Sequence, residues 1–88
     1  METQQLQIIY KYLKDTYKEY NISYRKSPDI TGSYDFAIDT GISRIILKIS
    51  RKIWDDHNSE KTVQHLEGQQ IIIRKALLDN QNASFLIN

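Results

Sequence analysis

The sequence contains no cysteine, only one proline and only three glycines. The missing thiols exclude disulfide bonds, thiol catalysis and thiolate metal ligands. The glycines form no phosphate-binding loop, and no serine lies in a nucleophile-elbow pattern. We therefore predict no catalytic residues and no cofactor, and we expect that the protein is not an enzyme.

Long apolar runs and an excess of one charge are also missing. No apolar stretch approaches the roughly 18 residues of a membrane-spanning helix, and the start, Met1 to Leu6, lacks the basic and apolar segments of a signal peptide. We therefore expect a cytoplasmic protein with no membrane partner. Twelve basic and eleven acidic side chains give a net charge of +1, unlike the strongly basic composition of a dedicated nucleic-acid binder.

What remains is the composition of a small globular domain. Forty per cent of the residues are apolar and 26% are charged, which is ordinary for a folded chain. A chain of 88 residues is long enough for one hydrophobic core and too short for two. The prediction is a single domain over residues 1–88.

The clearest periodic pattern covers residues 3–20. Apolar and aromatic side chains recur there three and four apart, along one side of a helix: Leu6, Ile9, Tyr10, Leu13, Tyr17 and Tyr20. This pattern predicts an amphipathic helix that buries that side. Ile8 and Tyr12 lie together on the opposite flank and are not needed for the core.

Alternating residues predict three strands next. Residues 22–26 are typical of a short edge strand, and residues 34–39 and 44–49 predict a hairpin. An even loop centred on Thr40-Gly41 places Phe36 opposite Ile45. The same hairpin puts charges of opposite sign on its outer face: Asp35, Asp39, Arg44 and Lys48.

The rest of the chain predicts helices and a last strand. Residues 50–57 lose the alternation and are typical of a helical turn that buries Ile53 and Trp54. One long helix is expected from an N-cap at Ser59 to Leu78, and residues 83–87 predict a final strand. The predicted fold is α+β: an N-terminal helix, a three- or four-stranded antiparallel sheet and a long C-terminal helix, in the order α-β-β-β-α-β.

The tripeptide Asp39-Thr40-Gly41 resembles the active-site loop of retroviral-type aspartic proteases. In that family one such aspartate from each of two subunits shares a proton. Residues 71–75 are faintly similar to the second motif of the family, but Ile73 replaces its glycine and the spacing is too short. A tight hairpin turn explains the tripeptide better.

Histidines and carboxylates are gathered in one region, but they match no metal site. His57 and His65 are eight residues apart, and the nearby acidic residues Asp55, Asp56 and Glu60 follow no known ligand spacing. We therefore predict surface side chains here and no bound metal.

Basic residues around the second hairpin strand define an alternative function. Phosphate-seeking charge and one aromatic ring occur together there: Arg44, Lys48, Arg51, Lys52 and Trp54. The order of elements also resembles the double-stranded RNA-binding domain, although Asn58 to Thr62 lacks the basic stretch of that family. The alternative is a weak nucleic-acid-binding protein that uses residues 44–54.

The leading hypothesis depends on apolar residues that the core does not need. The helical patterns leave four of them unassigned: Ile8, Tyr12, Ile72 and Ala76. Side chains of this kind are typical of protein interfaces. We therefore expect a small non-enzymatic module that binds a protein partner or forms a homodimer, as an adaptor, inhibitor or antitoxin-like regulator of bacterial or phage origin.

Residues 42–88 carry one further resemblance. The strand ending in Ile49-Ser50, the short segment to Asp56-His57, a helix with isoleucines and basic residues and a final strand resemble a family of short uncharacterised bacterial proteins. The resemblance implies this order of elements and no particular activity.

Overall fold

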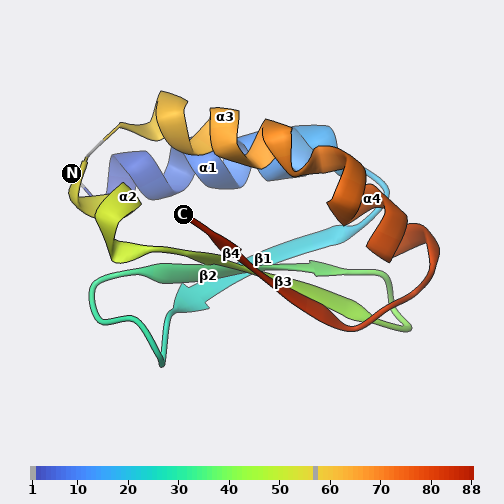
Figure 1. The fold of residues 1–88 in the computed structure, drawn as a ribbon. Coiled ribbons are helices and arrows are strands. Elements are labelled where there is room, and N and C mark those ends of the chain that lie inside the picture. Colours follow the sequence, from blue (N-terminus) through green and yellow to red (C-terminus); the bar gives the residue numbers. More distant parts are fainter. Residues whose placement is uncertain (1, 57) are drawn as a thin grey trace.

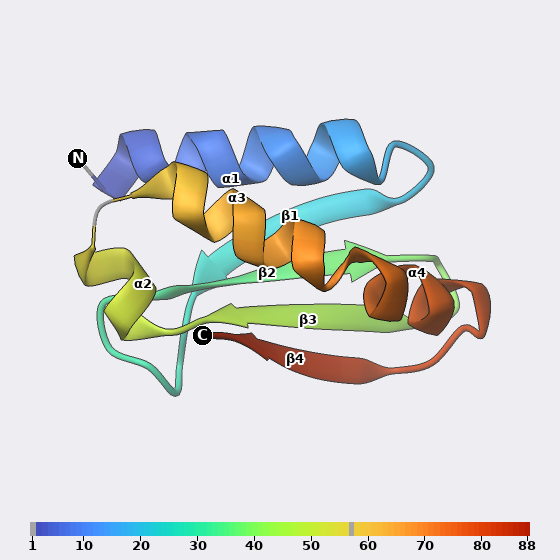
Figure 2. The ribbon, with the colours of Figure 1, turned by 45° about the horizontal axis from the view of Figure 1, so that its top comes forward.

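A computed structural model describes residues 2–56 and 58–88 of the chain (Figure 1). The elements in chain order are α1 (Glu2–Thr16), β1 (Asn21–Lys26), β2 (Tyr34–Asp39), β3 (Arg44–Ile49), α2 (Arg51–Asp55), α3 (Ser59–Gly68), α4 (Gln70–Leu78) and β4 (Ala83–Ile87). In Figures 1 and 2, α1 and α3 lie side by side over one face of the sheet. The predicted α+β class is therefore confirmed.

The sheet is mixed, so the prediction of an antiparallel sheet is wrong for its last strand. The strand order is β1-β2-β3-β4, and the first three strands form an antiparallel meander. β4 pairs with β3 in parallel. Residues 50–82 carry the chain back over the sheet through α3 and α4, and a long helical crossover of this kind returns a strand in the same direction as the one before it.

The hairpin register differs by two residues from the predicted one. Phe36 pairs with Leu47, and Ile38 pairs with Ile45. The reason is a wider turn, which the backbone closes with a hydrogen bond of 3.0 Å from the Thr40 amide to the Ser43 carbonyl. A shift of two residues preserves the side of the sheet that each side chain occupies. Phe36, Ile38, Ile45, Leu47 and Ile49 are accordingly buried, whereas Tyr34 is only partly buried.

The core lies between α1, the crossover helices and the inner face of the sheet. Leu6, Ile9, Leu13 and Tyr17 are buried along α1, as their spacing predicts. Regular helix ends at Thr16, four residues before the predicted end. The Tyr17 amide still donates to the Leu13 carbonyl at 2.9 Å, which keeps the ring on the core side of the chain.

The expected long C-terminal helix is two shorter ones. α3 ends where the Gln69 amide donates to the carbonyls of His65 and Leu66, at 3.2 and 3.1 Å, in a tightened last turn. Gly68 favours a break here, because glycine costs about 1 kcal/mol relative to alanine in a helix. Beyond it α4 runs in another direction (Figure 2).

The N-terminus of α3 also differs from the prediction. The N-cap is Asn58 and not Ser59, because the Asn58 side-chain oxygen accepts a hydrogen bond of 3.1 Å from the Lys61 amide. Asparagine and serine are about equally good N-caps. Their order in the sequence therefore did not show which of them fills the position.

Arg74 joins α4 to the end of α1. Its guanidinium donates a hydrogen bond of 2.8 Å to the Thr16 carbonyl and lies 5.0 Å from the centre of the Tyr17 ring. Burial raises the pKa of the Tyr17 hydroxyl to about 12. The phenol therefore stays neutral beside the arginine at physiological pH.

The predicted helical turn after β3 is α2, and it buries Ile53 and Trp54 as expected. The Trp54 indole N–H donates to the Ser33 hydroxyl, which in turn donates to the Ile49 carbonyl. This chain of hydrogen bonds holds the β1–β2 loop against the end of β3. The Trp54 ring is consequently part of the core.

Truncating the core side of α1 should destabilise the fold. Leu13 is fully buried, so Leu13→Ala should lower the free energy of unfolding by about 2–5 kcal/mol. Lys11→Ala, on the exposed side of the same helix, should change it by less than about 0.5 kcal/mol. Urea denaturation measures both, and equal losses would show that α1 does not pack through this side.

Candidate functional site

The four residues predicted to bind a partner do not form one surface. Ile8 and Ile72 are exposed as expected, but Tyr12 is half-buried against the core. Ala76 is only 4% exposed and belongs to the core, so the prediction that the core does not need it is wrong. The cause is the break at Gln69, which sets the faces of α4 independently of α3.

Ile8 and Ile72 are also separated along the helices. α4 meets the end of α1 at Thr16, where Arg74 binds the carbonyl. Ile8 lies eight residues earlier, which corresponds to about 12 Å along a helix. Ile8 and Ile72 therefore do not form one continuous apolar surface.

The apolar side chains with the highest exposed fractions on the helices lie on α4. Ile71 is 84% exposed. Leu78 lies two turns further along the same side of α4 and is 77% exposed. Ile72 lies next to Ile71 and is also exposed. We call Ile71, Ile72 and Leu78 the α4 surface.

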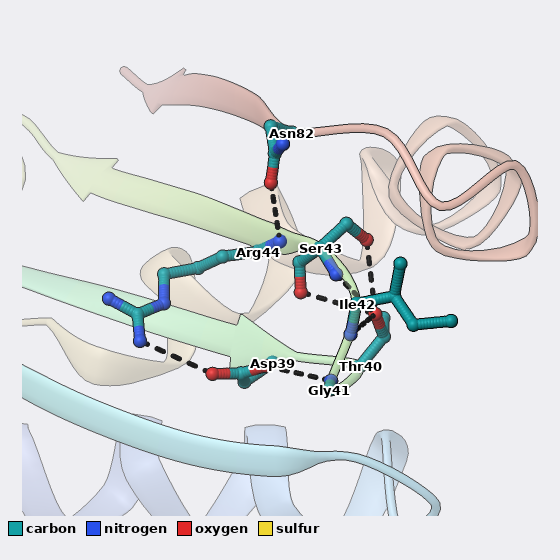
Figure 3. A network of polar contacts seen from close by, with 7 residues as sticks. All are labelled: Asp39, Thr40, Gly41, Ile42, Ser43, Arg44 and Asn82. Atoms are coloured by element: carbon teal, nitrogen blue, oxygen red, sulfur yellow. Dashed lines mark hydrogen bonds and ion pairs between the residues drawn. The ribbon is translucent and has the colours of Figure 1, made fainter.

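Ile42 adds a fourth exposed apolar side chain at the same end of the molecule. Figures 1 and 2 both place the β2–β3 turn and α4 at this end. Ile42 is 80% exposed, and its side chain projects away from the hydrogen bonds of the turn (Figure 3). Contact with a partner at this end would therefore remove several apolar side chains from water.

Sequence reasoning missed most of this site, although one signal for it was present. The helical pattern that places Ile72 away from the core also places Ile71 and Leu78 away from it. Ile42 gave no such signal, because a side chain in a turn belongs to no periodic pattern.

The β2–β3 turn is held by a network of polar contacts (Figure 3). The Asp39 carboxylate accepts hydrogen bonds from the Gly41 amide at 2.8 Å and from the Arg44 guanidinium at 3.2 Å. The Thr40 hydroxyl accepts from the Ser43 amide at 2.9 Å. Gly41 has a φ of 90°, a backbone conformation that residues with a Cβ atom rarely adopt.

These contacts account for Asp39-Thr40-Gly41 as a hairpin turn. The bond from the Gly41 amide, followed by the bond from Arg44, holds the pKa of the Asp39 carboxyl below its ordinary value of 3.8. An aspartate of this kind is ionised at neutral pH and already bound by its neighbours. The tripeptide therefore stabilises the conformation of the turn.

The basic residues of the alternative nucleic-acid site are mostly paired. Arg44 binds Asp39, Lys48 binds Asp29 at 2.7 Å, and Arg51 lies 3.5 Å from Asp55. Trp54 is buried and cannot stack on a base from outside. The predicted patch thus retains exposed Lys52 and loses its aromatic platform and most of its free charge.

Asp35 is a buried carboxylate on the uncovered face of the sheet. It is 2% exposed, and among the described residues neither of its oxygens has a hydrogen-bond partner. Its cross-strand neighbours are Arg25 and Lys48, yet Lys48 binds Asp29. Among the described residues, an ion pair across the hairpin therefore forms between Asp39 and Arg44 but not between Asp35 and Lys48.

Asp35 also borders a hollow of about 90 Å³ that Ala37 and Arg25 help to line. A carboxylate in this position favours an ammonium or guanidinium donor. Arg25, which is exposed and lies opposite Asp35 on β1, carries such a donor.

The described residues contain no group of three histidine, cysteine or acidic side chains that is placed to bind a metal ion. His65 is exposed on α3, whereas His57 lies outside the described residues. Within residues 2–56 and 58–88, each helix is too short or too polar to cross a membrane.

Comparison with protein-family models, with curated proteins and with solved structures finds no match to this chain. The resemblance of residues 42–88 to a bacterial family therefore stays a prediction.

The turn network makes stability depend on pH in acid. A carboxyl whose pKa is lowered by folding stabilises the fold while it is ionised, so its contribution is present above about pH 4 and is lost as the pH falls through the lowered pKa. Asp39→Asn should therefore reduce the loss of stability between about pH 5 and pH 2. Urea denaturation at several pH values measures this.

Asp15→Asn is the control for this experiment. Asp15 is exposed on α1, and no ion pair within the described residues includes it. If both variants flatten the acid dependence equally, the contacts of Asp39 are not its source.

Proposed function

We propose that the protein is a non-enzymatic protein-binding module that docks a partner on the α4 surface. The observation that supports this most directly is the exposure of Ile71 and Leu78 on one side of a nine-residue helix. Burial of an aliphatic side chain of this size is worth about 1.5–3 kcal/mol. Two such anchors, with Ile72 beside them, can supply much of the free energy of a specific complex.

The charges around the α4 surface suit the rim of an interface. Lys75 lies between Ile71 and Leu78 on the same side of α4, and Asp79 follows the helix. Both are exposed, so they can remain partly solvated while the apolar residues are covered. A small module with this surface acts by contact, as an adaptor, an inhibitor or a regulator of its partner.

Nucleic-acid binding through residues 44–54 remains the alternative proposal, and we favour it less. Its three best-placed cations already bind carboxylates, which an approaching phosphate would have to displace. The protein surface around them therefore lacks the concentrated positive charge that sequence-independent binding requires.

The α4 surface is tested by placing charges on it. Ile71→Asp with Leu78→Asp should leave the circular dichroism spectrum unchanged, because both side chains are mostly exposed. The double variant should lose at least one protein that the tagged wild type retains from a lysate of its own organism. Mass spectrometry of the retained proteins, with and without nuclease, measures the difference.

Gln7→Asp with Gln64→Asp is the matched control. It adds the same two charges to exposed positions of α1 and α3, away from the α4 surface. This control should retain the partner. Retention of the same proteins by all three versions would contradict a docking role for α4.

The alternative is tested by titration with salt. If residues 44–54 bind phosphates through three or four contacts, the affinity for duplex RNA or DNA must fall more than about tenfold between 50 and 200 mM salt. We expect little binding at physiological salt. Submicromolar binding there, abolished by Arg51→Glu with Lys52→Glu, would favour the nucleic-acid function over the protein-binding one.

A further inference from the structure

The two edges of the sheet differ in their defence against pairing with another chain. Among the described residues no strand lies beyond β1 or beyond β4. β1 carries Arg25 and Lys26, and charged side chains are a common way to protect an edge. β4, with the sequence Ala-Ser-Phe-Leu-Ile, carries no charge, no proline and no bulge. Its edge is therefore open to another strand.

The hydrogen bonds to β3 show which backbone groups of β4 point outward. The Ile87 carbonyl accepts a hydrogen bond of 2.9 Å from the Ser50 amide, so Ile87 directs its backbone groups toward β3. Backbone groups alternate in direction along a strand. Ser84 and Leu86 therefore direct their N–H and C=O groups to the open edge, and both residues are exposed.

We infer that a second copy of this chain pairs with β4 in antiparallel orientation, about a two-fold axis at Phe85. In this register Ser84 of each copy lies opposite Leu86 of the other. Because both of these residues have outward backbone groups, each pair exchanges two hydrogen bonds, which gives four across the axis. The pairing uses every outward group within the two strands.

Charge favours a second copy as the occupant. A two-fold axis brings identical segments together, so an edge with charges of one sign repels itself. β4 has no charged side chain, and its self-pairing brings no like charges into contact. Self-pairing of β1 would instead bring Arg25 and Lys26 close to their own copies. The uncharged edge is therefore the one that a two-fold axis can use.

The side chains of β4 also fit this arrangement. The two Phe85 rings meet beside the axis on the helix-covered face, where Phe85 is half-buried. Leu86, which is 56% exposed, and Ser84 meet across the axis on the opposite face. Pairing of five-residue strands forms a small interface, so we expect association in the micromolar range.

This contact and the α4 surface use different residues, so each can be removed while the other is intact. The dimer is measured by sedimentation velocity of the full chain between about 1 and 500 µM. The expected result is a concentration-dependent shift to twice the 10.4 kDa mass. A wild-type chain that stays monomeric throughout, or one that forms open-ended aggregates, would overturn the proposal.

Two matched double variants test the register. Ser84→Lys with Leu86→Lys places ammonium groups opposite each other and should weaken association at least tenfold. Ser84→Asp with Leu86→Lys places a carboxylate opposite an ammonium and should restore association to within about threefold of the wild type. Both substituted positions are exposed, so circular dichroism should show the same fold for both. Equal effects of the two variants would contradict the register.

A cysteine cross-link supplies a second measurement, since the wild-type chain has no cysteine. Phe85→Cys should form an intermolecular disulfide, because residues that face each other without hydrogen bonds in an antiparallel pair have Cα atoms about 4.5 Å apart. Ala83→Cys is the control, since position 83 faces position 87 of the other copy. Faster cross-linking of Ala83→Cys than of Phe85→Cys would refute the two-fold axis at Phe85.

Discussion

The burial of one side of β3 is the constraint on which the rest of the structure depends. Ile45, Leu47 and Ile49 are fully buried, and they alternate with residues that face away from the helices. β3 is also the strand at which the sheet changes from antiparallel to parallel pairing. A slip by one residue would expose all three aliphatic side chains, at about 1.5–3 kcal/mol each. The strand therefore fixes which face of the sheet the helices cover.

Local periodicity predicted where most helices and strands lie. The features that it did not predict depend on contacts outside each segment. The positions of α1, the hairpin strands, α2 and β4 follow from spacing within each segment. The direction of β4 depends on the path of the whole crossover, and the hairpin register depends on contacts within the turn around Thr40. The break at Gln69 was signalled only by Gly68, whose cost of about 1 kcal/mol a helix can tolerate. Helix length and strand direction were therefore the features that sequence left open.

The candidate site was predicted in part for the same reason. Exposure of Ile72 follows from its place on any helix through this segment, but burial of Ala76 follows from how α4 turns after Gln69 to meet β3 and the end of α1. Trp54 illustrates the opposite error. As one aromatic ring among cations it suggested base stacking, yet its indole N–H is used to hold Ser33 inside the fold. Neighbouring residues in a sequence thus do not show whether a side chain has a partner within the chain.

The two edges of the sheet also determine what kind of assembly the proposed pairing can form. Joining two copies through β4 gives one continuous sheet in which both outermost strands are β1. Each of these edges carries Arg25 and Lys26, which oppose the addition of further strands. A head-to-tail contact between β4 and β1 would instead leave one uncharged edge free at every step and could continue without limit. The unequal distribution of charge between β1 and β4 therefore favours a closed dimer over a fibre, and the proposed contact uses none of the residues of the α4 surface.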